Sequence, residues 1–147
     1  MATAAGLSAN LTAYSEPRCA RQASVLLVDD DVDNLMLLSF ILEQFPCTIV
    51  CETDGKAALE RINQTRFDLI MLDIQLPGIS GTDLVRMLRT NPLNASLPVI
   101  AVTALARKQD QEEILRAGCD RYISKPYMVD DLEALIGQYI TPLQASA

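Results

Sequence analysis

Short apolar runs and longer amphipathic segments alternate along most of the chain. Five short segments rich in branched or aromatic side chains have the length of strands. They cover residues 24–28, 48–52, 69–72, 99–103 and 121–124. The run at 24–28 is apolar at every position after Ser24, and the run at 69–72 is apolar throughout. Such continuous apolar runs are typical of strands covered on both faces of a sheet. The pattern therefore predicts a sheet in the interior of the protein.

Between these runs, apolar residues recur at helical spacing. The first such segment, 32–45, begins after Asp31, a favourable N-cap residue, and ends before Pro46. Its apolar positions are Leu35, Leu38, Phe40, Ile41, Leu42 and Phe45. A second helix is expected after Asp54, and three more over residues 80–90, 106–117 and 130–140. Gly118 is suited to end the fourth of these helices.

Alternation of strands and helices predicts the fold class. Parallel strands joined by helices form a doubly wound α/β sheet with helices on both faces. Right-handed crossovers leave few arrangements, and the flavodoxin-like strand order 2-1-3-4-5 is the commonest small one. We expect this five-stranded parallel sheet within residues 23–141, between a flexible N-terminal tail, 1–22, and a short C-terminal tail, 142–147.

Polar residues at the ends of four strands supply the candidate chemistry. In the expected order, the carboxyl ends of strands one, three, four and five are neighbours, and they carry Asp29, Asp30, Asp73, Thr103 and Lys125. Crowded carboxylates call for a hard cation, and Mg²⁺ fits oxygen ligands of this kind. A lysine charge and a threonine hydroxyl are donors that a transferring phosphoryl group needs. Because no cysteine, histidine or serine nucleophile lies at these ends, a carboxylate is the expected covalent acceptor, and Asp73 is the best placed.

Composition and charge narrow the function classes. The 147 residues are 50% hydrophobic, which suits a single domain with a substantial core. A net charge of -7, with 12 scattered lysines and arginines, argues against direct nucleic-acid binding. No apolar run reaches the roughly 18 residues of a membrane span, and a secretory signal is absent, so we expect a soluble cytoplasmic protein. A transit peptide within residues 1–22 is the alternative, although arginine is sparse there.

Cysteine spacing gives no sign of a disulfide framework or a zinc site. The four cysteines are Cys19, Cys47, Cys51 and Cys119, and the chain has no histidine. We expect reduced thiols without a function in catalysis or metal binding.

Four separated motifs coincide with the strand ends. In chain order they are Val28-Asp29-Asp30, Leu72-Asp73 with Leu76-Pro77-Gly78 and Gly81, Thr103-Ala104, and Tyr122-Ile123-Ser124-Lys125-Pro126. Together they resemble the receiver domain of two-component response regulators, over residues 25 to about 140. The resemblance also implies a cis peptide bond before Pro126.

The resemblance implies roles for the acidic residues. Asp73 would accept a phosphoryl group from a phosphohistidine on a sensor histidine kinase or phosphotransfer protein. Asp30 and Asp73 would ligate Mg²⁺ directly, with the backbone carbonyl of Gln75, while Asp29 would act through water. The chain would not be an enzyme beyond Mg²⁺-dependent self-phosphorylation and autodephosphorylation.

The resemblance also implies a switch and an output surface. Lys125 would pair with the phosphoryl group, Thr103 would move to hydrogen-bond it, and Tyr122 would swing inward as Thr103 moves. The family reads this change on the surface of the fourth helix, fifth strand and fifth helix, here about 106–140. Because few residues follow that helix, we expect a stand-alone regulator that signals through a protein partner or a phosphorelay.

Other interpretations of the same residues remain open. A phosphohydrolase with an aspartyl intermediate usually carries a second acid two residues after the nucleophile, where this chain has Gln75. A phosphorylation-independent interaction module would normally have lost one or more of the five central residues. Thr103 could also serve only as a strand residue, Tyr122 as a core aromatic and 107–113 as a solvated helix face.

Overall fold

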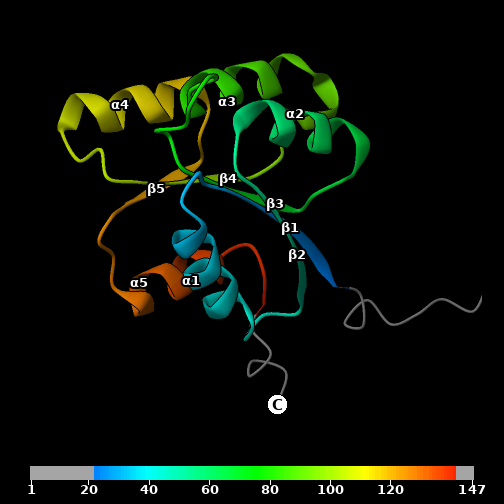
Figure 1. Cartoon of the computed structure of the whole chain (residues 1–147), viewed down its shortest axis with the longest axis vertical. Helices are drawn as coiled ribbons and strands as arrows, with labels where there is room; N and C mark the ends of the chain where they lie inside the picture. Colours follow the sequence, from blue (N-terminus) through cyan, green and yellow to red (C-terminus); the bar gives the residue numbers. More distant parts are fainter. Residues whose placement is uncertain (1–21, 142–147) are drawn as a thin grey trace, which may run out of the picture.

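Five parallel strands form one sheet in the order β2-β1-β3-β4-β5 (Figure 1). The structure is a computed structural model, and it describes residues 22–141. The strands are β1 (Ala23–Val28), β2 (Cys47–Glu52), β3 (Leu69–Leu72), β4 (Val99–Thr103) and β5 (Arg121–Ser124). The predicted fold class and strand order are confirmed.

Helices cover both faces of the sheet. In Figure 1, α2, α3 and α4 lie on one face, while α1 and α5 lie on the other. Their bounds are α1 (Val32–Leu42), α2 (Gly55–Gln64), α3 (Gly81–Thr90), α4 (Lys108–Ala117) and α5 (Val129–Ile136), with a short 3₁₀ helix, η2 (Pro92–Asn94), before β4. Asp31 and Asp54 cap α1 and α2 as expected, because their carboxylates accept hydrogen bonds from first-turn amides.

Alternate residues of the central strands supply two separate cores. Leu26 of β1 and Ile70 of β3 face the layer of α2, α3 and α4, whereas Leu27 and Met71 face α1 and α5. All four side chains are fully excluded from water. Burial of one such side chain contributes about 1.5–3 kcal/mol, so the central strands are held on both faces and their carboxyl ends are firmly positioned.

Three helix boundaries differ from the sequence prediction by two residues or more. α1 ends at Leu42 rather than Phe45, where a tighter turn forms before Pro46, because the residue preceding a proline disfavours helical geometry. Phe40 is 70% exposed, since Leu38 and Ile41 occupy the sheet-facing side of α1. α4 begins two residues later than expected, and α5 ends at Ile136 rather than at 140, although Ile140 still packs in the core.

Apart from Gln22, the expected tails lie outside the described residues, so their boundaries stay predictions. No helix within residues 22–141 combines the length and apolar character needed to cross a membrane. The cysteines in the described part of the chain, Cys47, Cys51 and Cys119, are free thiols.

Candidate functional site

Four strands deliver polar side chains to one edge of the sheet. Asp29 follows β1 and Asp73 follows β3, and the amide of Asp73 donates to the carbonyl of Val28 at 2.9 Å. On the other side, Thr103 ends β4 and its carbonyl accepts from the amide of Lys125 at 2.8 Å. The backbone ladder therefore extends one residue beyond the strands and fixes where these side chains start.

Three carboxylates form a cluster at this edge. Asp29, Asp30 and Asp73 each place one carboxylate oxygen within 4.8 Å of the others. Asp29 is 2% and Asp73 is 7% exposed, whereas Asp30 is exposed. A set of carboxylate oxygens with one side open to water matches the ligands of Mg²⁺, which keeps several waters in its octahedral shell. The donor set therefore fits this ion.

Lys125 joins the two buried carboxylates. Its Nζ lies 3.0 Å from Asp29 Oδ2 and 3.2 Å from Asp73 Oδ2. The other oxygen of each carboxylate accepts a backbone amide, from Asp31 for Asp29 and from Gln75 for Asp73. Each buried carboxylate is thus held by one cation and one amide, which fixes its orientation.

Burial and charge act in opposite directions on this pair. Burial raises the pKa of Asp73, and the Gln75 amide and the Lys125 ammonium only partly oppose that effect. For Lys125, burial by itself would lower the pKa, but the hydrogen bond to Asp29 and the charges of both carboxylates outweigh it, so the pKa is raised. Both pKa values are therefore raised, but for different reasons: burial dominates at Asp73, whereas two anionic partners outweigh it at the less buried Lys125. The lysine is therefore firmly protonated, while the Asp73 carboxylate is short of positive charge.

The loop after Asp73 is held tightly against the start of α3. The amide of Gly81 donates to the carbonyl of Ile74 at 2.8 Å. A Cβ at Gly81 would lie 2.6 Å from Ile74 Cα and 2.8 Å from the carbonyl oxygen of Asp73. Only glycine allows this close approach, so Gly81 helps to fix the backbone that carries Asp73.

Thr103 and Tyr122, the expected switch residues, occupy different surroundings. Thr103 is completely buried, and its hydroxyl oxygen accepts a hydrogen bond from the amide of Leu105 at 3.2 Å. Tyr122 is partly buried against the core on the α2, α3 and α4 face. The hydroxyl of Thr103 is therefore hydrogen-bonded to the backbone of the loop before α4. The switch roles of both residues stay predictions. The expected cis peptide bond between Lys125 and Pro126 is present.

A groove beside the cluster was not predicted from the sequence. It has a volume of about 460 Å³, and it runs between α1 and the segment that links β5 to α5. Its lining residues are Asn34, Leu37, Leu38, Val102, Ala104, Lys125, Pro126, Tyr127 and Val129. The outer side of α1 is also apolar, with Val32, Met36 and Phe40 at 58%, 65% and 70% exposure. The spacing of four between these three residues is a sequence signal for an exposed apolar stripe.

Comparison with known proteins identifies a family model and relatives that this chain resembles. The family model described as the response regulator receiver domain matches residues 25–137. The polar-differentiation response regulator DivK of Brucella anthropi is 38% identical over 117 residues, which cover 80% of this chain and 95% of DivK. The sensor protein GacS of Pseudomonas syringae is 35% identical over 113 residues, which are 75% of this chain and 12% of GacS.

Solved structures agree with this result. The receiver domain of Francisella response regulator 1452 is 30% identical with a TM-score of 0.73, and the match covers 80% of this chain and 96% of that chain. The receiver domain of sensor histidine kinase PA1611 from Pseudomonas aeruginosa is 28% identical with a TM-score of 0.74, covering 81% and 98%. The latter structure has a magnesium ion coordinated in its active site cleft.

Proposed function

The chain belongs to the receiver domain family of response regulators, and on that premise we propose that it accepts a phosphoryl group on Asp73 in two-component signalling. The observation that carries this proposal is the Asp73 carboxylate, 7% exposed, beside two other carboxylates and 3.2 Å from the ammonium of Lys125. A buried carboxylate with so little positive charge beside it is stabilised when a cation binds next to it, or when a bond formed at one of its oxygens removes its own charge.

The proposed reaction transfers a phosphoryl group between two side chains. An oxygen of Asp73 forms a bond to phosphorus as the phosphorus–nitrogen bond of a phosphohistidine breaks, and the leaving imidazole takes up a proton. Lys125, 3.2 Å from Asp73 Oδ2, would compensate charge on the phosphoryl oxygens. Asp29, Asp30, Asp73 and the backbone of Gln75 would hold Mg²⁺. When bound, this ion neutralises the charge that the cluster and the phosphoryl group share.

The proposed phosphoryl donor is a sensor histidine kinase or a histidine phosphotransfer protein. Support comes from the apolar stripe on α1 and the neighbouring groove, which reaches Lys125. Exposed apolar surface of this kind marks a protein contact. A donor seated there would place its histidine near Asp73. Because the kinase's phosphohistidine is formed in the cytoplasm, the proposal places the reaction there.

Phosphorylation would act on the rest of the domain through charge. The new group carries nearly two negative charges and three acceptor oxygens, which can attract the Thr103 hydroxyl away from Leu105. Tyr122 would then move inward, and the surface of α4, β5 and α5 would carry the signal to a downstream protein or relay. A change from about 1:99 to 99:1 between two states requires contacts that differ by roughly 5.5 kcal/mol.

Labelling with radioactive acetyl phosphate and Mg²⁺ tests the acceptor. Asp73→Asn removes the nucleophile, and Asp54→Asn is the matched control, because Asp54 caps α2 and asparagine retains that cap. We expect label on the wild type and on Asp54→Asn but not on Asp73→Asn. Label that persists on Asp73→Asn would move the acceptor elsewhere.

Beryllofluoride with Mg²⁺ tests the switch separately. Bound at Asp73, it stands in for a phosphoryl group, so the amide signals of Thr103 and Tyr122 should shift. Unchanged spectra at a concentration that saturates the site would overturn the proposed response.

A further inference from the structure

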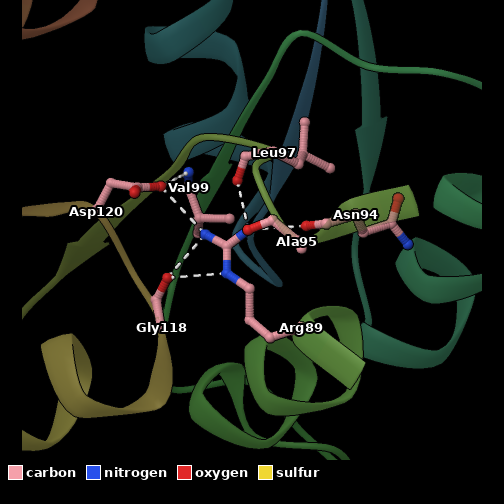
Figure 2. A network of polar contacts seen from close by, with 7 residues as sticks. All are labelled: Arg89, Asn94, Ala95, Leu97, Val99, Gly118 and Asp120. Carbon is pink, nitrogen blue, oxygen red and sulfur yellow. Dashed lines mark hydrogen bonds and ion pairs between the residues drawn. The ribbon is translucent and has the colours of Figure 1, made fainter. Parts of the chain in front are cut away.

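The guanidinium group of Arg89, near the end of α3, is surrounded by acceptors from other segments (Figure 2). Nη2 and Nε donate to the carbonyl of Gly118 at 2.7 and 3.1 Å, and Nη2 lies 3.1 Å from Asp120 Oδ2. Nη1 donates at 2.9, 3.3 and 2.7 Å to the carbonyls of Asn94, Ala95 and Leu97. One side chain thus joins α3, the loop before β4 and the connection from α4 to β5.

Asp120 ties this network to the sheet. Its Oδ2 accepts the amide of Val99 at 2.8 Å, and its own amide donates to the carbonyl of Val99 at 2.9 Å. Val99 is the first residue of β4 and is fully buried. The carbonyl of Gly118 that Arg89 binds is therefore held two residues from a fixed point in the core.

The two ends of α4 are held very differently. Only Ile114 and Ala117 of this helix are buried, and both lie in its second half. Residues 108–113 are exposed or half-exposed, and the N-cap residue, Arg107, makes no side-chain capping bond. At the other end, the amides of Gly118 and Cys119 donate to the carbonyls of Leu115 and Ile114. The N-terminal half of α4, which follows the loop bonded to Thr103, is the weakly held half.

Gly118 is shaped for its place beside Arg89. Its φ of +122° lies in the region that favours glycine, and a Cβ there would come within 2.9 Å of Arg89 Cγ. The stem of Arg89 thus packs directly on the turn that ends α4, while the guanidinium binds the carbonyl of the same residue.

We propose that Arg89 holds the C-terminal end of α4 in place at Gly118. When the surroundings of Thr103 change, the N-terminal half of α4 then moves while its C-terminal end stays fixed. The change at Thr103 rests on the proposed function, but the anchoring of α4 by Arg89 does not. Arg89 is a positioning residue in this proposal: it confines the response of α4 to its N-terminal half, residues 108–113, and the loop 104–107 before it.

Native-state hydrogen exchange tests the anchor without phosphorylation. In the wild type, the amides of Cys119 and Asp120 should exchange at least about tenfold more slowly than that of Glu112, because they open only when the Arg89 network breaks. Equal protection at both ends of α4 would overturn the proposal.

Two arginine variants distinguish a local anchor from a general contribution to stability. Arg89→Lys retains the charge and most of the stem but loses the planar fork of donors. Arg86→Lys is the matched control, because Arg86 also links α3 to α4, through an exposed ion pair with Glu113 at 3.6 Å. Arg89→Lys should raise the exchange rates of Cys119 and Asp120 about tenfold relative to Leu26, a core amide that reports global opening. A uniform rise that includes Leu26, or an equal effect of Arg86→Lys, would overturn the anchor.

Beryllofluoride with Mg²⁺ tests the confinement. In the wild type, amide shifts should be large over 104–113 and small at Gly118 and Cys119, and in Arg89→Lys they should spread to those two residues. Wild-type shifts as large at Gly118 as at 104–113 would overturn the pivot. A spectrum without any shift would contradict the proposed function instead, and the exchange rates would then decide the anchor alone.

Discussion

Lys125 Nζ lies 3.2 Å from Asp73 Oδ2, although the two residues are 52 positions apart in the sequence. The same ammonium lies 3.0 Å from Asp29 Oδ2, so one positive charge serves two buried carboxylates. With Asp30 also in the cluster, negative charge exceeds positive charge at this edge of the sheet. The site is therefore electrostatically prepared for an added cation.

Removal of the lysine charge should strengthen Mg²⁺ binding. In Lys125→Met, the ion no longer competes with an ammonium for Asp73, and affinity should rise severalfold to about tenfold. Without Mg²⁺, the variant should be less stable than the wild type, since two buried carboxylates lose their partner, and Mg²⁺ should restore more of its melting temperature.

Calorimetric titration and thermal melting with and without Mg²⁺ measure both effects. Arg66→Met is the control, because Arg66 is exposed and precedes β3 at the opposite edge of the sheet. It removes one positive charge without touching the cluster. Weaker Mg²⁺ binding in Lys125→Met than in this control would contradict the charge argument.

Asp73→Asn should stabilise the Mg²⁺-free protein at about pH 7, on the order of 1 kcal/mol. Burial raises the pKa of Asp73 above its ordinary value of 3.8, so the folded state holds the proton more tightly than the unfolded state does. Ionisation therefore costs stability as the pH rises through the folded pKa. The advantage of the neutral asparagine should shrink as the pH falls toward 3.8, where the folded wild type is itself protonated.

Urea denaturation of both proteins across this pH range gives the difference directly. Asp54→Asn again serves as the control, since it makes the same substitution at an exposed carboxylate outside the cluster. A stability difference that grows at lower pH would show the opposite sign and would contradict the assignment of burial as the dominant influence on Asp73.

The sequence predicted the fold and the acidic edge for a simple physical reason. In a doubly wound sheet, a polar residue directly after a buried strand can only lie at the carboxyl edge, so Asp29, Asp73 and Lys125 had to converge once the strand order was chosen. The backbone ladder then fixes where these side chains start.

Other features depend on packing that spacing does not reveal. Arg89 and Gly118 are 29 residues apart, and nothing local indicates that the ends of α3 and α4 lie side by side. Similarly, Phe40 matched a helical apolar pattern, but only the crossing of α1 over the sheet decides that Leu38 and Ile41 face inward and Phe40 faces water.

Gly81→Ala should destabilise the protein by about 2–4 kcal/mol, because its Cβ would overlap the backbone of Asp73 and Ile74. Gly137→Ala is the matched control. Gly137 has helical φ and ψ of −61° and −18°, and a Cβ there would come no closer than 3.2 Å to another atom. This variant should change the stability by no more than about 1 kcal/mol. Chemical denaturation measures both, and a tolerated Gly81→Ala would mean that the loop after Asp73 can move freely.

Asp30 and Gln75 should affect Mg²⁺ binding in different ways. Asp30→Ala removes an exposed carboxylate of the cluster, so the affinity for Mg²⁺ should fall by about tenfold or more. Gln75→Ala should leave the affinity nearly unchanged, because the Gln75 side chain is exposed and only its backbone carbonyl is expected to bind the ion. Both substitutions are at exposed positions, so the melting temperature without Mg²⁺ should differ little from that of the wild type and would exclude misfolding as the cause. Calorimetric titration with Mg²⁺ separates the two variants. A large loss in Gln75→Ala would assign its side chain to the metal site, and an unchanged affinity in Asp30→Ala would remove Asp30 from it.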